Sequence, residues 1–219
     1  PADVQGANLD LENLKHFNPD EYIKDFNEVA KDESLAEIAK QLEVAKRPVI
    51  LAGNGIRLAN AISEFKHFTQ QYKVPVVASY LGADLITYDS PSYIGVVGIK
   101  GDRAANFTMQ NSDLIISIGC RLAVGVTGFE YELFAREAKL IVVDIDPKEH
   151  QKNTVKIDCF INADAKVFLN QLKQQKIYQA DLNWQKKTLR WKNKWSITAT
   201  KYPSDQNNIN KYTFMQHLN

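Results

Sequence analysis

The 219-residue sequence has few of the residues that build redox or metal centres. Its two cysteines, Cys120 and Cys159, lack metal-ligand spacing and are too few for a disulfide framework. A reducing compartment is therefore expected, and neither cysteine is expected to bind zinc. We predict no metal site in the chain.

Long apolar runs and an excess of charge are also missing. No apolar run approaches the length of a membrane span, and the N-terminal PADVQGANLD has neither the charged nor the apolar part of a signal peptide. Lysine and arginine number 27 against 26 acidic residues, so the net charge is +1. We therefore predict a cytoplasmic protein without general affinity for nucleic acid or membranes. The first residue, Pro1 rather than methionine, suggests a processed fragment.

A recognisable catalytic set is absent as well. The four histidines fall in an expected linker, a helix surface, a loop and the tail, and each is expected to be solvated. They are His16, His67, His150 and His217. The sequence contains no nucleophile elbow and no Walker A lysine. We predict no catalytic residue in this chain.

Six short apolar runs alternate with segments of helical periodicity. The central run, 114–118, is broken only by Ser117 and suits a strand buried on both faces of a parallel sheet. The other runs are 49–53, 75–79, 94–98, 140–145 and 159–163. The alternation predicts an α/β fold, a three-layer, Rossmann-like domain with a six-stranded parallel sheet and helices on both faces.

The flanks of this α/β domain differ from it in pattern. Residues 1–33 are polar without sustained periodicity and are expected to form an extended N-terminal linker. Ser34 is expected to cap the first helix of the domain, which we place at 34–176. Further helices are expected at 58–72, 103–110, 129–137 and 165–174.

Residues 177–219 are expected to form a helical tail. Trp184, Trp191 and Trp195 share one helical face, and lysines and Arg190 lie mostly elsewhere. This pattern favours an amphipathic helix docking on a neighbouring domain. The alternative is a basic and aromatic surface for nucleic acid.

The carboxyl ends of the six strands should meet at one edge of the sheet. Glycines and cations there can bind a pyrophosphate, and an aspartate can accept from ribose hydroxyls. The residues expected at this edge are Gly53, Gly55, Gly98, Lys100, Gly119, Arg121, Asp144 and Ile145. The alternative is that the glycines serve tight turns, Arg121 pairs with a local acid and the groove is empty. Residue types alone leave both interpretations open. The glycine motif at Gly53 is only partial and an acid suited to NAD is missing, so the first turn does not by itself indicate NAD binding.

Several motifs follow one another along the α/β domain. They are Gly95-Val-Val-Gly-Ile-Lys-Gly101, Ala105-Asn106, Gln110-Asn-Ser-Asp113 with the strand after it, Val126-Thr-Gly128, and VVDIDPKEHQKN ending at Asn153. Together they resemble the central domain of thiamine-diphosphate-dependent enzymes of the acetolactate synthase type. The resemblance covers about 34–174 in order. It implies that 1–33 is a linker from a preceding pyrimidine-binding domain. By the same resemblance, 177–219 is a helical linker and the start of a pyrophosphate-binding domain.

The resemblance implies an enzyme whose catalytic parts lie elsewhere. In the family, a glutamate of the first domain activates the cofactor, and a Gly-Asp-Gly motif with a later asparagine in the third domain holds magnesium and diphosphate. Neither is present here, so the chain alone is expected to be inactive. The parent is expected to be a homo-oligomeric 2-oxo acid decarboxylase and carboligase that includes the missing first and third domains.

Acetolactate synthases hold FAD along this same edge of the sheet, and other members hold ADP or nothing. The resemblance carries FAD contacts onto Gly53, Gly55, Gly98, Gly119, Arg121, Val126, Asp144, Ile145 and Asp164. The chain departs from the family with Ile99-Lys100, where Met-His is frequent, and with Gly125, where the family has an arginine.

Two other functions compete with the parent enzyme. One is a stand-alone FAD- or ADP-binding module. The other is a sirtuin-like NAD-dependent deacylase, a family that usually has a four-cysteine zinc site. Two cysteines make this second alternative a poor match.

Overall fold

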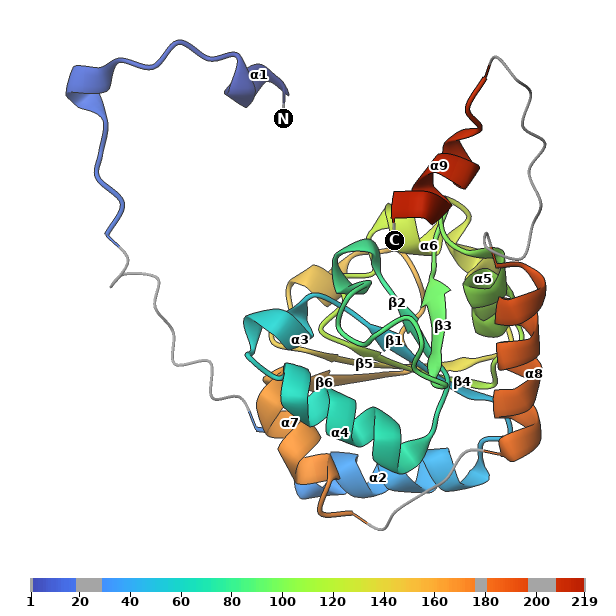
Figure 1. Cartoon of the computed structure of the whole chain (residues 1–219). Coiled ribbons are helices and arrows are strands. Elements are labelled where there is room, and N and C mark those ends of the chain that lie inside the picture. Colours follow the sequence, from blue (N-terminus) through green and yellow to red (C-terminus); the bar gives the residue numbers. More distant parts are fainter. Residues whose placement is uncertain (1, 19–28, 176–180, 197–207, 219) are drawn as a thin grey trace.

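The structure, a computed structural model, describes residues 2–18, 29–175, 181–196 and 208–218. Its centre is a six-stranded parallel sheet with the order β3-β2-β1-β4-β5-β6 (Figure 1). The strands are β1 (Pro48–Ala52), β2 (Val76–Ala78), β3 (Tyr93–Val96), β4 (Leu114–Ile118), β5 (Lys139–Asp144) and β6 (Cys159–Asn162). All six predicted strands are confirmed, with ends that differ by two residues at most.

Helices cover both faces of the sheet and complete the predicted three layers (Figure 1). One face carries α2 (Asp32–Val44), α3 (Gly55–Leu58), α4 (Ile62–Tyr72) and α7 (Ala165–Leu172). The other face carries α5 (Arg103–Gln110) and α8 (Leu182–Lys194). The shorter and terminal elements are α1 (Ala2–Gln5), η1 (Leu11–Asn13), η3 (Tyr80–Gly82), α6 (Val124–Thr127), η4 (Tyr131–Leu133), η5 (Glu149–Gln151) and α9 (Lys211–Leu218).

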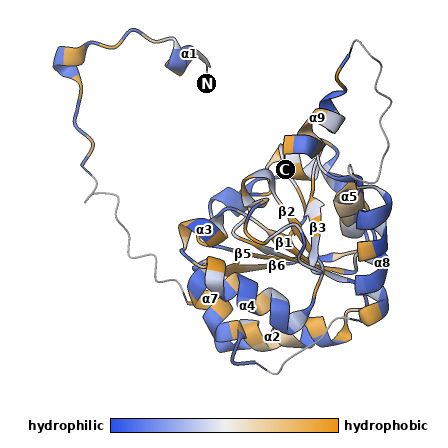
Figure 2. Ribbon diagram, in the orientation of Figure 1, coloured by the Kyte–Doolittle hydropathy of each residue, from blue (hydrophilic) through white to orange (hydrophobic). Residues whose placement is uncertain are grey.

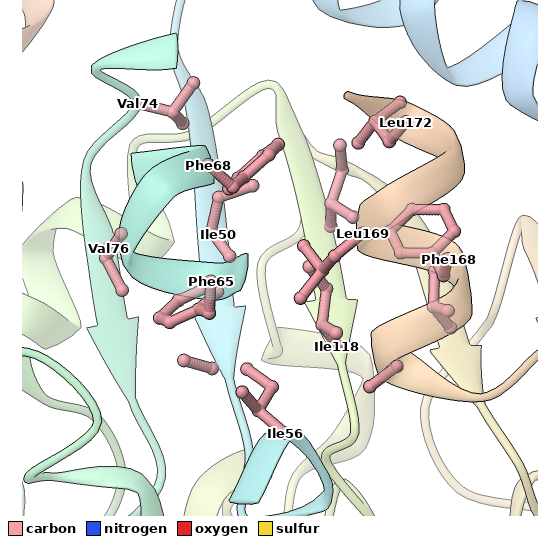
Figure 3. Packing of buried hydrophobic residues seen from close by; sticks show 14 of the residues in the cluster. Ile50, Ile56, Phe65, Phe68, Val74, Val76, Ile118, Phe168, Leu169 and Leu172 are labelled. Atoms are coloured by element: carbon pink, nitrogen blue, oxygen red, sulfur yellow. The ribbon is translucent and has the colours of Figure 1, made fainter. Parts of the chain in front are cut away.

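The sheet is buried from both sides, which explains why its strands are apolar along their whole length. Every residue of β1 and β4 is buried. Phe65 of α4 lies over β1, and Leu169 of α7 reaches over β4, which carries Ile118 (Figure 3). Phe168 of α7 is buried in the same cluster. The hydropathy colouring shows the same arrangement, with apolar strands inside and polar helix surfaces outside (Figure 2).

On the N-terminal side of α2, the described residues differ in burial. Every described side chain at 3–18 is exposed, as expected of an extended linker. Ala30, by contrast, is buried in the core, so packing on the domain begins a few residues before the predicted boundary at residue 34.

None of the described helices is long and apolar enough to cross a membrane.

Helix α8 uses its tryptophan face to dock, as predicted, and the surface it docks on is the α/β domain itself. The indole nitrogen of Trp184 donates to the carbonyl oxygen of Pro48 at 3.0 Å. Trp191 stands edge-on to Phe107 of α5, with ring centres 5.9 Å apart. Lys192 is buried and donates to the carbonyl oxygens of Tyr88 and Tyr93. Because Trp184 and Trp191 contact the α/β domain, they do not form the exposed aromatic surface on which the nucleic-acid alternative depended.

Three predictions about helices are wrong. The predicted helix at 129–137 is reduced to the short η4, because Ala135 takes a left-handed conformation (φ 46°) that interrupts a helix. The helix predicted at 58–72 is split by Asn60, which is also left-handed (φ 52°), and Leu58 is exposed instead of packed. Ser34 does not cap α2, since the helix begins at Asp32 and the amide of Ser34 donates to Lys31 within the first turn.

Candidate functional site

A groove of about 700 Å³ runs along the carboxyl edge of the sheet, where β1, β4, β5 and β6 end. We call it the carboxyl-edge groove. It lies at the point where the strand order reverses, since the chain passes from β1 to β2 on one side and later to β4 on the other. Ligands of open parallel sheets usually bind at this position.

Six of the ten predicted cofactor contacts line the groove. They are Gly55, Gly119, Arg121, Asp144, Ile145 and Asp164. Two others, Gly98 and Val126, line a separate hollow of about 210 Å³ on the α5 side of the sheet. Gly53 is buried and Lys100 is exposed, and neither lines one of these two spaces. The fold therefore divides the predicted set instead of gathering it in one place.

The glycines at this edge allow the strand ends to touch. A Cβ atom on Gly53 would lie 2.0 Å from the carbonyl oxygen of Gly119. A Cβ atom on Gly55 would lie 2.6 Å from the Cα of Gly119. The amides of Gly53, Gly55 and Gly119 already donate to backbone carbonyls, each at 2.9 Å. The amide of Gly98 donates to the side chain of Asn106 at 2.9 Å. These four amides are not free for a phosphate, which corrects the prediction that they would donate to one.

Arg121 supplies the positive charge of the groove and has an acidic partner. Its guanidinium donates to the carboxylate of Glu149 at 3.1 Å, and Glu149 also pairs with Lys152. Arg121 is mostly exposed, whereas Glu149 is largely covered. A phosphate that binds Arg121 would therefore compete with Glu149, although such exposed pairs contribute only about 0–1 kcal/mol.

The acids of the groove are held by backbone hydrogen bonds. Asp144 accepts from the amide of Asp146 at 3.0 Å, and Asp164 accepts from the amides of Lys166 and Val167 at 2.8 and 3.0 Å, capping α7. Each carboxylate has about four lone-pair positions, so these bonds occupy only part of its capacity. Both acids can also accept from hydroxyl groups of a ligand.

His150 is not solvated, and this prediction is wrong. Its side chain is only 3% exposed, with Nε2 3.4 Å from a carboxylate oxygen of Asp144 and the ring against Phe160. The short η5 helix after Pro147 folds this part of the loop back over β6. The other three histidines are exposed, as predicted.

Cys120 follows directly after Gly119 at the end of β4 but offers no reactive thiolate. Burial raises the pKa of its thiol from 9.0 to about 11, so the thiol is neutral at physiological pH. Among the residues that the structure describes, no three histidine, cysteine or acidic side chains are arranged to hold a metal ion.

Comparison with known proteins decides the family. The family described as "Thiamine pyrophosphate enzyme, central domain" matches residues 35–172. The chain belongs to this family. The match covers all six strands of the sheet and leaves out residues 1–34 and 173–219. It includes all the residues of the carboxyl-edge groove.

Relatives of this thiamine pyrophosphate enzyme domain are large subunits of acetolactate synthases. The probable large subunit of Methanococcus aeolicus is 36% identical over 181 residues, which are 81% of this chain and 30% of that protein. The large subunit of Lactococcus lactis is 33% identical over 187 residues, 85% of this chain and 31% of that protein. The isozyme 2 large subunit of Escherichia coli is 36% identical over 153 residues, 69% of this chain and 26% of that protein. The chain thus spans less than a third of the length of these relatives.

Sequence reasoning missed Glu149 and His150, which shape the groove around Arg121 and Asp144. No local pattern marks either residue as part of the site, although Pro147 lies shortly before both of them. Only the fold shows that the chain turns back here toward Arg121.

Proposed function

We propose that this chain is the middle part of a longer thiamine-diphosphate-dependent enzyme that decarboxylates a 2-oxo acid and joins the product to a second carbonyl compound. The observation that carries the proposal is the family match over 35–172, together with relatives that are acetolactate synthase large subunits about three times as long. These relatives give no support to a stand-alone binding module.

The proposal assigns the chemistry to the parts outside this chain. Thiamine diphosphate, held with magnesium by the flanking domains, would supply the electron sink for decarboxylation. The central domain would act as a scaffold between them. We also propose that the parent is a cytoplasmic homo-oligomer, with 1–33 and 177–219 as its connections to the first and third domains.

The carboxyl-edge groove is proposed to hold an ADP moiety, either as ADP or as part of FAD. The donor set fits a nucleotide unevenly. Asp144 and Asp164 suit ribose hydroxyls, whereas a pyrophosphate finds favourable charge only at Arg121, because Asp146 and Glu149 add negative charge nearby. The remaining four predicted contacts lie outside the groove, and their role in binding stays a prediction.

The test is the full-length gene and its product. We expect a glutamate in the upstream domain and a Gly-Asp-Gly motif downstream. We also expect carbon dioxide release from pyruvate that depends on added thiamine diphosphate and magnesium. The 219-residue chain alone serves as the control and should release none. A full-length protein without these two motifs, or one inactive on every 2-oxo acid tried, would overturn the proposal.

A further inference from the structure

The carboxyl-edge groove extends over the ends of four strands, and beside it the loops after β2, β3 and β4 contact one another. Tyr80, in η3 directly after β2, accepts a hydrogen bond from the amide of Lys100 at 2.7 Å through its hydroxyl. The amide of Ile99 donates to the carbonyl oxygen of Gly125 at 3.0 Å. The ring of Tyr80 lies beside Gly125, 3.5 Å from the position where a Cβ would be. These contacts join the loops after β2, β3 and β4 into one cover, which we call the Tyr80 bridge.

The Tyr80 bridge separates the two hollows of this edge. Leu81, the next residue after Tyr80, lines the carboxyl-edge groove. Ile99 and Val126, the neighbours of Lys100 and Gly125, line the smaller hollow on the α5 side. The two spaces share no lining residue. A ligand that continues along the edge from the groove therefore meets the bridge.

We propose that the groove recognises a single nucleoside diphosphate, and that Tyr80 is the residue that denies binding contacts to the second half of a dinucleotide such as FAD. This inference rests on the proposed nucleotide groove. A nucleotide held by Asp144, Asp164 and Arg121 occupies the space between β6 and α3. The flavin of FAD would have to displace the bridge or extend into water, and in water it gains no contact with the protein.

The position of Tyr80 makes it suitable for substitution. Its side chain is exposed and belongs to neither of the two apolar cores. Water can replace its hydroxyl as the acceptor for the Lys100 amide. The variant Tyr80→Ala should therefore fold, and it removes the ring from the path along the edge. The variant Tyr80→Phe keeps the ring and is the matched control.

The experiment is calorimetric titration of the 219-residue chain with ADP and with FAD, alongside flavin fluorescence. For the wild type and Tyr80→Phe we expect equal affinities for the two ligands and unquenched flavin fluorescence. For Tyr80→Ala we expect FAD to gain about tenfold over ADP, with quenched fluorescence, because the ring system can then pack on the exposed edge.

The outcomes separate the two proposals. Wild-type FAD binding that is ten times tighter than ADP binding, with a quenched flavin, overturns the role of Tyr80 while the nucleotide groove stands. If the ratio of FAD affinity to ADP affinity is the same in Tyr80→Ala as in the wild type, the role of Tyr80 is also overturned and the nucleotide groove stands. If neither ligand binds the wild type or Tyr80→Ala, the nucleotide groove itself is wrong, and this inference falls with it. The wild-type ratio alone tests the inference if the alanine variant fails to fold.

Discussion

Replacing Gly53 with alanine tests whether direct contact between strand ends builds the carboxyl edge. The added methyl carbon would lie 2.0 Å from the carbonyl oxygen of Gly119 and 2.5 Å from the Cα of Cys120. Both are backbone atoms in a parallel ladder, where the amide of Gly53 donates to Ile118 at 2.9 Å. Neither can move without disturbing the pairing of β1 with β4. Overpacking costs about 1–3 kcal/mol when side chains can adjust, so here we expect the free energy of unfolding to fall by about 3 kcal/mol or more.

The matched control is Gly125→Ala. Its added carbon would meet only the ring of Tyr80, at an ordinary distance of 3.5 Å, so we expect a change within about 0.5 kcal/mol. Urea denaturation followed by tryptophan fluorescence measures both variants, since Trp184 is buried against β1. The two variants are compared by their urea midpoints, provided that the dependence of the free energy of unfolding on urea concentration is unchanged. If the midpoint of Gly53→Ala matches that of Gly125→Ala, the packing argument is wrong.

Three further predictions concern charge and burial. Because burial raises the pKa of Cys120 from 9.0 to about 11, its contribution to stability is complete below pH 9 and is lost as the pH rises toward 11. Between pH 9 and 11 the urea midpoint should fall less steeply with pH for Cys120→Ala than for the wild type. The same fall in both proteins would contradict the argument. Glu149→Gln should release Arg121 and strengthen ADP binding up to about fivefold in a titration, whereas unchanged or weaker binding would show that the pair does not compete with phosphate. Lys192→Met should lower the free energy of unfolding by about 1–3 kcal/mol, because two backbone carbonyls lose a charged donor, and an unshifted urea midpoint would refute this.

The sheet could be predicted because a strand buried on both faces leaves a simple trace in the sequence. In β4, the run 114–118 is apolar and its single polar residue, Ser117, is buried with the others. The alternation of such runs with helical segments then fixes parallel pairing and a common carboxyl edge, because each crossover returns the chain in the same sense. The placement of Arg121 and Asp144 near one another followed from this topology, whereas Asp164 was expected there only from the family resemblance.

Other features depended on conformations that residue types do not specify. Ala135 and Asn60 take left-handed conformations that break two predicted helices, although alanine is a good helix former. His150 and Glu149 come to the groove through a turn whose path is set by packing against β6 and by the charge of Arg121. No local pattern distinguishes them from solvated residues of the same types.

The sequence by itself determined the α/β architecture, the order of its elements and the family, because these depend on periodicity and on motifs that are local in the chain. The tertiary structure decided how the carboxyl edge is divided. It turned the amides of Gly53, Gly55 and Gly119 into ladder bonds, paired Arg121 with Glu149, and set Tyr80 across the path between two hollows. Each of these contacts joins residues more than 15 positions apart, so they arise only when the strands and their loops pack together.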